Sequence, residues 1–239
     1  MEFNEFKEKM IINVDKLGIT LSEIQLKQFY NYMNLLIEWN KKINLTAIIE
    51  PDEIILKHFV DSLTISKYIS DGTRVVDVGT GAGFPGIPLK IYRQDLEITL
   101  LDSLQKRINF LDEVIRELNL EKIETVHSRV EDFGKDKKYR EKFDISTSRA
   151  VANLATLSEY LLPLVKIGGK VISMKGSLIE EELENSKNAI KILGGGIERV
   201  DEFDLPNSDI SRNIILIDKI KETPNKYPRK AGEPSKKPL

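Results

Sequence analysis

The chain of 239 residues contains no cysteine. This absence excludes disulfides, thiolate nucleophiles and zinc sites built from cysteine. Histidine is scarce as well, because only His58 and His127 occur. We therefore expect no metal centre and no catalysis through a sulfur nucleophile.

Long apolar runs are also absent. The longest apolar stretches, such as residues 161–165, have the length of core segments, whereas a membrane helix needs about 20 apolar residues. Residues 1–5 are acidic and carry no apolar signal segment. With 41% apolar and 31% charged residues, the composition predicts a cytoplasmic, globular α/β domain with an appended subdomain and no membrane contact.

An excess of positive charge is lacking too. The formal net charge is −2, which is not typical of a nucleic-acid-binding protein. The charge is unevenly placed, because residues 219–239 carry seven Lys or Arg against two Glu, with four prolines among them. This segment has no apolar periodicity, so we interpret it as a solvated terminus or as an arm that contacts phosphates.

Glycine, in contrast, recurs at every second position after a short apolar run. Residues 75–86 read Val-Val-Asp-Val-Gly-Thr-Gly-Ala-Gly-Phe-Pro-Gly. This pattern is typical of a buried strand that ends in a turn against a ligand. Glycine suits the turn because it tolerates positive φ and has no Cβ to block the ligand.

Two kinds of ligand fit this turn. Residues 81–86 match the dinucleotide pattern G-x-G-x-x-G, with Asp102 about 20 residues further on. Residues 77–83 match D-x-G-x-G-x-G, the pattern of S-adenosylmethionine sites, which also uses Asp77. A carboxylate there suits a ligand with an ammonium and a sulfonium, but it would repel a pyrophosphate. The residues thus favour S-adenosylmethionine, with Asp102 accepting hydrogen bonds from ribose hydroxyls in either case. The predicted contacts of the turn are Asp77, Gly79, Gly81 and Gly83.

Residues 1–70 are predicted to form a helical N-terminal subdomain. Apolar residues recur at three- and four-residue spacing from residue 21 to residue 39, and Thr20 with Glu23 fits a capping box. Residues 52–68 form a further helical stretch after Pro51. We expect residues 71–220 to be the methyltransferase domain and residues 221–239 to be a basic, proline-rich tail.

Strands and helices alternate from residue 74 onward, which predicts a parallel sheet. The helical patterns are clearest at residues 104–118 and 153–162. The last two strands follow each other without a helix, so they should pair as an antiparallel edge. This layout predicts the Rossmann-like fold of class I S-adenosylmethionine-dependent methyltransferases, with a mostly parallel seven-stranded sheet. The expected strands are residues 74–78, 97–101, 122–127, 143–147, 170–174, 197–204 and 213–220.

The candidate site follows from this sheet. Ligands of open α/β sheets bind beyond the carboxyl ends of the strands, where the strand order reverses. That rule brings the glycine turn together with Asp102, Ser103, residues 128–131 and residues 148–150. We expect these segments to surround one crevice.

Within the crevice, Phe84 and Val130 are candidates for the two faces of an adenine site. Glu131 or nearby backbone would then read the exocyclic amine of the base. The alternative for Glu131 is an exposed acid in the first turn of a helix, where acids are common.

Two arginines follow strand ends that should open into the crevice. Arg129 and Arg149 are each compatible with a surface ion pair, but two arginines facing one pocket indicate an anionic or guanine-bearing substrate. Lys175, after the fifth strand, could join them. These three residues are the predicted catalytic set.

The segment after the fourth strand lacks a familiar motif. Enzymes that methylate exocyclic amines usually carry Asn/Asp-Pro-Pro-aromatic there, whereas residues 146–150 read Ser-Thr-Ser-Arg-Ala. Methylation of pyrimidine C5 needs a cysteine, which is absent. Guanine N7 needs no general base, because it has a free lone pair and no proton to lose, so positioning could supply most of the rate.

Several blocks resemble one family over the whole length of the chain. The chain resembles the RsmG (GidB) family, which methylates guanine N7 at one position of 16S ribosomal RNA. The blocks are residues 38–46 (Glu-Trp-Asn-Lys-Lys-Ile-Asn-Leu-Thr), 58–62 (His-Phe-Val-Asp-Ser), 77–86, 101–103, 106–107, 148–150 and 226–234 (Lys-Tyr-Pro-Arg-Lys-Ala-Gly-Glu-Pro). The family usually has proline where Ala231 stands, a departure that casts little doubt on function.

The resemblance implies a cofactor, S-adenosylmethionine, and a partner, 16S rRNA or the small ribosomal subunit. It also implies site residues. These are cofactor contacts at Gly79, Phe84, Val130, Glu131 and Arg149, ribose contact at Asp102, and His58, Asp61 and Ser62 near the site.

The sequence leaves two other functions open. A dehydrogenase would bind NAD at the same turn, and a non-catalytic RNA-binding module could keep the fold without transferring methyl groups. The choice of guanine rests on the resemblance alone. We expect the chain to act as a monomer.

Overall fold

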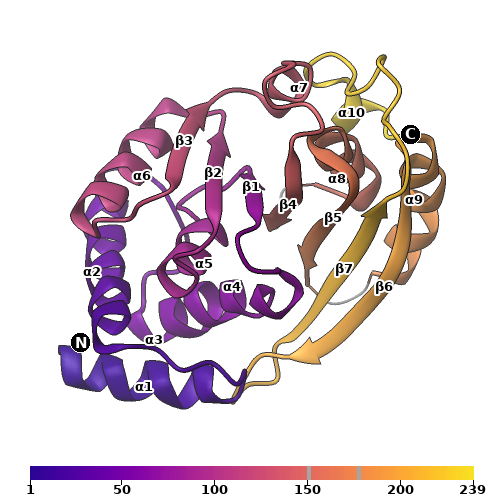
Figure 1. Cartoon of the computed structure of the whole chain (residues 1–239). Coiled ribbons are helices and arrows are strands. Elements are labelled where there is room, and N and C mark those ends of the chain that lie inside the picture. Colours follow the sequence, from indigo (N-terminus) through magenta and orange to yellow (C-terminus); the bar gives the residue numbers. More distant parts are fainter. Residues whose placement is uncertain (150–151, 177–178) are drawn as a thin grey trace.

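The computed structural model describes residues 1–149, 152–176 and 179–239. A seven-stranded sheet with the order β3-β2-β1-β4-β5-β7-β6 forms its centre (Figure 1). Strands β1 to β5 are parallel to one another, and β7 runs antiparallel to β5 and β6. This confirms the predicted parallel sheet with an antiparallel edge. The strands are β1 (Arg74–Val78), β2 (Glu97–Asp102), β3 (Ile123–His127), β4 (Phe143–Arg149), β5 (Val165–Lys175), β6 (Gly195–Asp204) and β7 (Ser211–Lys219).

Successive residues of the central strands alternate between two apolar cores. Val75 of β1 belongs to the core beneath the N-terminal helices, whereas Val76 belongs to the core on the opposite face. Leu100 and Leu101 of β2 divide in the same way. This period of two is expected for strands that are buried on both faces.

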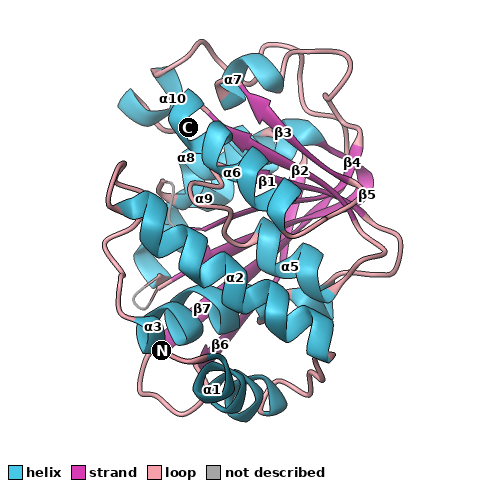
Figure 2. Cartoon of the chain, turned by 90° about the vertical axis from the view of Figure 1, so that its left-hand side faces the viewer, coloured by secondary structure: helices cyan, strands magenta, loops and turns pink. Residues whose placement is uncertain are grey.

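Helices cover both faces of the sheet. On the first face, α2 packs over α5 and α6, as Figure 2 shows. None of the helices in the described ranges is long and apolar enough to cross a bilayer. The helices of the first face are α1 (Phe3–Asp15), α2 (Glu23–Asn40), α3 (Pro51–Ile54), α4 (Asp61–Leu63), α5 (Gly86–Tyr92) and α6 (Gln105–Glu117). Those on the second face are α7 (Val130–Phe133), α8 (Leu154–Leu161) and α9 (Glu180–Ile192), with α10 (Glu233–Lys236) against α8.

The capping box of α2 lies two residues after the predicted one. The Ser22 hydroxyl accepts a hydrogen bond from the Gln25 N–H at 3.3 Å, and the Gln25 side chain accepts one from the Ser22 N–H at 2.8 Å. The predicted pair, Thr20 and Glu23, has the same spacing. Gln25 also donates to the Ile91 carbonyl at the end of α5, so a tertiary contact selects this register.

The helical stretch predicted at residues 52–68 is broken into short pieces. Between α3 and α4 the chain forms a π-helical segment, Ile55–Val60, and a 3₁₀ turn, Ser66–Tyr68, follows α4. Such π-segments often occur at functional sites. This one carries His58.

The N-terminal helices share one apolar core with the first face of the sheet. Phe59 of the π-helical segment contacts Phe29 of α2, with ring centroids 5.1 Å apart. The same cluster includes Ile98 and Leu100 of β2. The division into residues 1–70, 71–220 and 221–239 therefore describes sequence organisation, and we keep it as a proposal.

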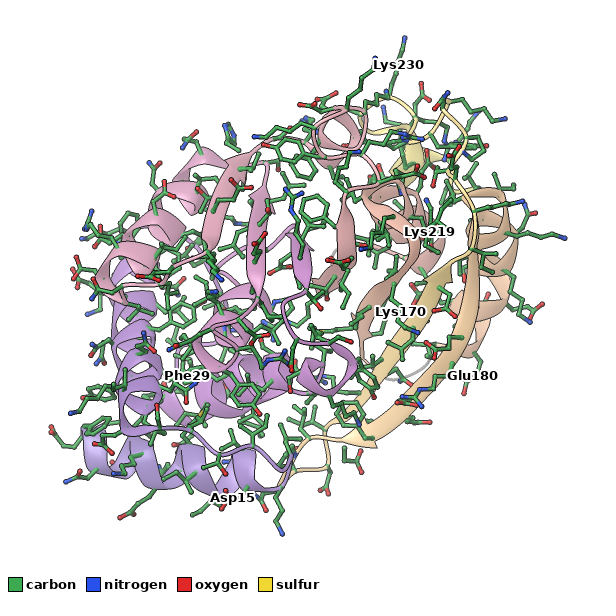
Figure 3. The ribbon with its side chains drawn as sticks, viewed as in Figure 1. Asp15, Phe29, Lys170, Glu180, Lys219 and Lys230 are labelled. Carbon is green, nitrogen blue, oxygen red and sulfur yellow. The ribbon has the colours of Figure 1, made fainter. Side chains whose placement is uncertain are left out.

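The C-terminal tail is docked rather than solvated. Arg140 donates hydrogen bonds to the carbonyls of Thr223 and Tyr227, both at 2.7 Å. Arg229 forms an ion pair with the fully buried Glu159 of α8 at 2.6 Å. The exposed side chain of Lys230 points away from the body, at the top of Figure 3. The tail thus has an inner side that packs and an outer side that is basic.

Candidate functional site

Three cavities lie around the carboxyl ends of strands β1 to β5. The Arg149 cavity, of about 450 Å³, is lined by Leu45, Thr46, His58, residues 79–82, Phe84, Asp102, Ser103, Arg107 and Arg149. The Arg129 cavity, of about 200 Å³, is lined by Val78, Gly79, residues 101–103, residues 128–131, Tyr160, Gly232 and Ser235. The Lys175 cavity, of about 370 Å³, is lined by Ile48, Lys57, His58, Asp61, Arg149, residues 174–176 and Arg212. The first two share Gly79, Asp102 and Ser103.

The glycine turn uses its glycines in two different ways. Gly81 has a φ of +64°, and a Cβ added there would meet only the Gly79 carbonyl oxygen, at 3.9 Å. Gly83 has a φ of +98°, and a Cβ there would lie 2.6 Å from Ile87 and 2.7 Å from the Tyr32 hydroxyl. Gly81 therefore opens toward the Arg149 cavity, whereas Gly83 allows the turn to pack against α2. Gly83 was predicted as a cofactor contact, but it lines none of these three cavities.

Asp77 lies behind the glycine turn rather than on a cavity wall. The Asp77 side chain is completely buried, and its Oδ2 accepts hydrogen bonds from the Thr80 hydroxyl at 2.6 Å and from the Gly86 N–H at 2.8 Å. Its Oδ1 has no partner among the described residues. Burial raises the pKa of Asp77 to about 6. Asp77 therefore supports the turn from behind, and the cofactor contact predicted for it stays a prediction.

Asp102 and Ser103 stand on the wall that the Arg149 and Arg129 cavities share. The Asp102 carboxylate accepts hydrogen bonds from the Gly81 N–H at 3.0 Å, the Leu104 N–H at 2.9 Å and the Arg107 guanidinium at 3.2 Å. These three bonds fix the carboxylate at the end of β2 and leave part of its accepting capacity for a ligand. The predicted meeting of Asp102 with the glycine turn is present in the structure.

Arg149 separates the Arg149 cavity from the Lys175 cavity. Its guanidinium donates to the Lys57 carbonyl at 2.9 Å, to the Asp61 carboxylate at 3.2 Å and to His58 Nδ1 at 3.0 Å. The second oxygen of Asp61 accepts a hydrogen bond from Arg212 Nε at 3.1 Å. Two arginines therefore flank one carboxylate that is only 3% exposed.

The rings of His58 and Phe84 form the apolar part of the wall of the Arg149 cavity. Their rings stack with centroids 4.3 Å apart and an interplanar angle of 16°. The Arg149 guanidinium lies 5.0 Å from the centre of the Phe84 ring. Burial, together with the nearby charge of Arg149, lowers the pKa of His58 to about 3. His58 is therefore a neutral ring at physiological pH, and its predicted position near the site is present in the structure.

The Arg129 cavity is built differently. The Arg129 side chain is exposed and makes no hydrogen bond to the described residues. Glu131 is buried, and its Oε1 accepts a hydrogen bond from the Gly232 N–H of the docked tail at 2.8 Å. The exposed acid considered for Glu131 is therefore wrong. Val130 lines this cavity whereas Phe84 lines the Arg149 cavity, so the structure places the two predicted adenine contacts in different cavities.

Lys175 borders the third cavity, beyond Arg149. Its ammonium is already paired with Glu182 at 2.6 Å, and its side chain is only 10% exposed. Lys175 shares the cavity with Arg212, which the sequence did not single out. The three predicted catalytic residues thus differ in burial and in partners. Ala150, which the sequence placed next to Arg149 in the crevice, lies outside the described residues.

Several side chains that line these cavities were not predicted from the sequence. Thr46 and Arg107 belong to blocks that carry the family resemblance, so that signal was available for both. Tyr160, on α8, and Arg212, on β7, have no local pattern around them. Only the tertiary structure brings those two to the strand ends.

Comparison with known proteins adds independent findings. A model of the family described as GidB, rRNA small subunit methyltransferase G, matches residues 25–214. The "Ribosomal RNA small subunit methyltransferase G" of Acetivibrio thermocellus is 54% identical over 236 residues, which cover 98% of this chain and 97% of that protein. The protein of the same description from Clostridium novyi is 49% identical and covers 96% of both chains.

One solved structure extends the comparison to the fold. The crystal structure of a SAM dependent methyltransferase from Aquifex aeolicus has a TM-score of 0.53 and 17% identity. It covers 76% of this chain and 97% of that one. The predicted class I methyltransferase fold is thereby confirmed.

Proposed function

Because this chain belongs to the rRNA small subunit methyltransferase G (GidB) family, we propose that it transfers a methyl group from S-adenosylmethionine to N7 of a guanine in 16S ribosomal RNA. The observation that carries the proposal is the meeting of two cavities at Asp102, beside the glycine turn. Membership of this family also removes the dehydrogenase that the G-x-G-x-x-G pattern had left open.

The residues present fit S-adenosylmethionine. Gly81 leaves open space beside the turn, and Asp102 offers a carboxylate between two cavities. Val130, with backbone of the tail at Gly232, would hold the adenine in the Arg129 cavity, while Asp102 would accept hydrogen bonds from the ribose. The methionine part would lie in the Arg149 cavity, near the guanidinium of Arg149. When bound, the cofactor supplies an electrophilic methyl group on a sulfonium.

The Lys175 cavity is our candidate for the target guanine. It lies directly across His58 and Arg149 from the proposed cofactor site, and Lys57 and Arg212 add positive charge to its wall. Guanine N7 carries a lone pair and no proton, so the protein needs to position the base rather than deprotonate it. Arg149 borders both cavities and is therefore the residue that we expect to orient the base relative to the methyl donor.

The other two predicted catalytic residues receive different roles. Arg129 is exposed at the rim of the Arg129 cavity, where it could contact an RNA phosphate. Lys175 is paired with Glu182, so we propose that it shapes the guanine cavity. Tail residues such as Lys230 are exposed beside this rim and would extend the basic surface.

The direct test is transfer of labelled methyl groups from S-adenosylmethionine. Small subunits and free 16S rRNA lacking the modification are incubated with the protein, and the RNA is digested to nucleosides. Label in 7-methylguanosine is the expected result. Label in another nucleoside would contradict the N7 assignment while leaving the cofactor in place. No label, with the cofactor shown to bind, would favour a non-catalytic RNA-binding module.

We further propose that the protein acts as a monomer in the cytoplasm, where ribosomal subunits are available. Sedimentation at micromolar concentration should give the mass of one chain, 27.3 kDa. A mass of two chains would contradict this part of the proposal.

A further inference from the structure

A series of hydrogen bonds ends at the hydroxyl of Thr46, on the wall of the Arg149 cavity. Arg149 Nη2 lies 3.0 Å from His58 Nδ1, and His58 Nε2 lies 2.9 Å from Thr46 Oγ1. The Ile48 N–H also donates to Thr46 Oγ1, at 3.0 Å. Thr46 is half-buried and lines the same cavity as Gly81 and Arg149.

The direction of each bond in this series is fixed. A guanidinium can only donate, so His58 Nδ1 must accept the hydrogen bond from Arg149. The pKa of His58 is lowered to about 3, so at neutral pH the ring carries one proton, which must lie on Nε2. His58 Nε2–H therefore donates to the Thr46 oxygen.

The direction of these hydrogen bonds determines the role of the Thr46 hydroxyl. A hydroxyl oxygen has two lone pairs, and those of Thr46 are used by His58 Nε2–H and by the Ile48 N–H. The O–H of Thr46 can therefore only donate. No acceptor for it is present among the described residues, and the cavity is the space beside it. The protein thus presents a pre-oriented donor to whatever fills the Arg149 cavity.

The chemistry of the cavity indicates which ligand atom accepts this bond. Under the proposed function, Asp102 accepts hydrogen bonds from the ribose and the adenine lies in the Arg129 cavity, which Thr46 does not line. The remaining part of the cofactor carries an ammonium, which can only donate, and a carboxylate, which can only accept. A carboxylate beside Arg149 would also gain from its positive charge.

We propose that the Thr46 hydroxyl donates a hydrogen bond to the carboxylate of the methionine part of the cofactor. Thr46 is then a positioning residue that fixes the amino-acid end of the methyl donor. The assignment rests on the proposed function, because it takes S-adenosylmethionine as the ligand of the Arg149 cavity. Arg149 and His58 would act partly through Thr46, by setting the direction of its hydroxyl.

The test compares two ligands on three proteins. Binding of S-adenosylhomocysteine and of its decarboxylated analogue, which keeps the amine, is measured by calorimetry on the unaltered protein, Thr46→Val and Thr46→Ser. We expect Thr46→Val to weaken S-adenosylhomocysteine binding about 10-fold, the effect of a hydrogen bond to a charged group. Binding of the decarboxylated analogue should change by less than about twofold, and Thr46→Ser should retain affinity for both ligands.

Other outcomes separate the alternatives. An equal loss for both ligands in Thr46→Val would show a purely structural role and overturn the proposal. Unchanged binding of both ligands with slower methyl transfer would place the hydroxyl against the RNA, which also overturns it. If the unaltered protein binds neither ligand, the proposed function itself fails.

A second measurement needs no ligand. Nitrogen-15 NMR of the histidine rings distinguishes the two neutral tautomers, and the proposal requires the proton of His58 on Nε2. A proton on Nδ1 would reverse the direction of the series and overturn the proposal.

Discussion

The Arg149 cavity and the Arg129 cavity adjoin the same glycine turn but are built by different means. Arg149 is surrounded by Asp61, His58 and the Lys57 carbonyl, all from the N-terminal helical region. Arg129 is exposed, and its cavity is completed by backbone from the docked tail. Two arginines near strand ends can thus have different surroundings, because distant segments decide how each is covered.

This difference separates a side of the site built by the N-terminal helical region from a side completed by the docked tail. Buried ion pairs and a stacked ring fix the side of Arg149, where we propose that the methyl donor and the guanine meet, so a small displacement there would misalign them. The side of Arg129 is completed by the tail, which is docked through the Arg229–Glu159 ion pair and through Tyr227 in the second core, so its geometry depends on that docking. We therefore expect substitutions on the side of Arg149 to slow methyl transfer, and substitutions on the side of Arg129 to weaken binding of RNA or of the cofactor.

The largest effect should come from Arg149. Arg149→Gln removes the partner of Asp61 and the donor to His58, so methyl transfer should fall by at least about 100-fold in single-turnover assays. Arg149→Lys should not restore it, since an ammonium cannot reproduce the fork of a guanidinium. Arg129→Gln is the matched control on the other side, and its loss should stay below about 10-fold and be expressed in the KM for RNA. Equal losses for Arg149→Gln and Arg129→Gln would remove the distinction between the two sides.

The next effect concerns the tail. Arg229→Ala leaves the fully buried Glu159 without its ion-pair partner, so we expect a loss of about 2 kcal/mol in the free energy of unfolding. Cofactor binding should weaken as well, because the tail supplies Gly232 to the Arg129 cavity. Urea unfolding and calorimetry measure the two effects. Lys230→Ala, next to Arg229 but exposed, should change neither the free energy of unfolding nor cofactor binding. Weaker cofactor binding in that control would contradict the proposed role of the tail as a wall of the Arg129 cavity.

A smaller effect is expected at Tyr32, which links α2 to the glycine turn. Its hydroxyl donates to the Ala82 carbonyl, and its loss in Tyr32→Phe should weaken cofactor binding by about fivefold, the effect of one neutral hydrogen bond. Tyr30→Phe removes a hydrogen bond from the same helix to the Met1 carbonyl, far from the turn in sequence. That control should bind the cofactor normally. Similar losses in both variants would show a general weakening of α2.

The last effect is absent at neutral pH and appears only in acid, as a pH dependence of stability due to His58. Its pKa falls from 6.5 to about 3 on folding, so the unfolded chain binds more protons between these values. The stability that this group contributes is complete above pH 6.5 and is lost as the pH falls toward 3. The free energy of unfolding, relative to His58→Gln, should decrease by up to about 1.4 kcal/mol per pH unit in this window. Parallel pH curves for the two proteins would contradict the buried, neutral ring.

The sequence was sufficient for the fold because the fold depends on local patterns. The apolar run before Gly79 predicted β1 to the residue, and the missing helix between the last two strands predicted the antiparallel edge. The prediction of a capping box at Thr20 was wrong, because the local sequence pattern at Ser22 is equivalent. The choice between them is made by the contact of Gln25 with α5.

The site was less predictable because its parts come from distant segments. The glycine turn and Asp102 are local to strand ends, and the structure brings them together as expected. Sequence alone could not show that Asp77 faces away from the cavity, or that the Gly232 backbone completes the Arg129 cavity. The contact of His58 with Arg149 joins residues 91 positions apart.

The most direct test of this account is a crystal structure of the protein with S-adenosylhomocysteine. We predict the adenine in the Arg129 cavity beside Val130, the ribose at Asp102, and the carboxylate in the Arg149 cavity within hydrogen-bonding distance of Thr46. A ligand bound in the opposite direction, or confined to one cavity, would contradict the account.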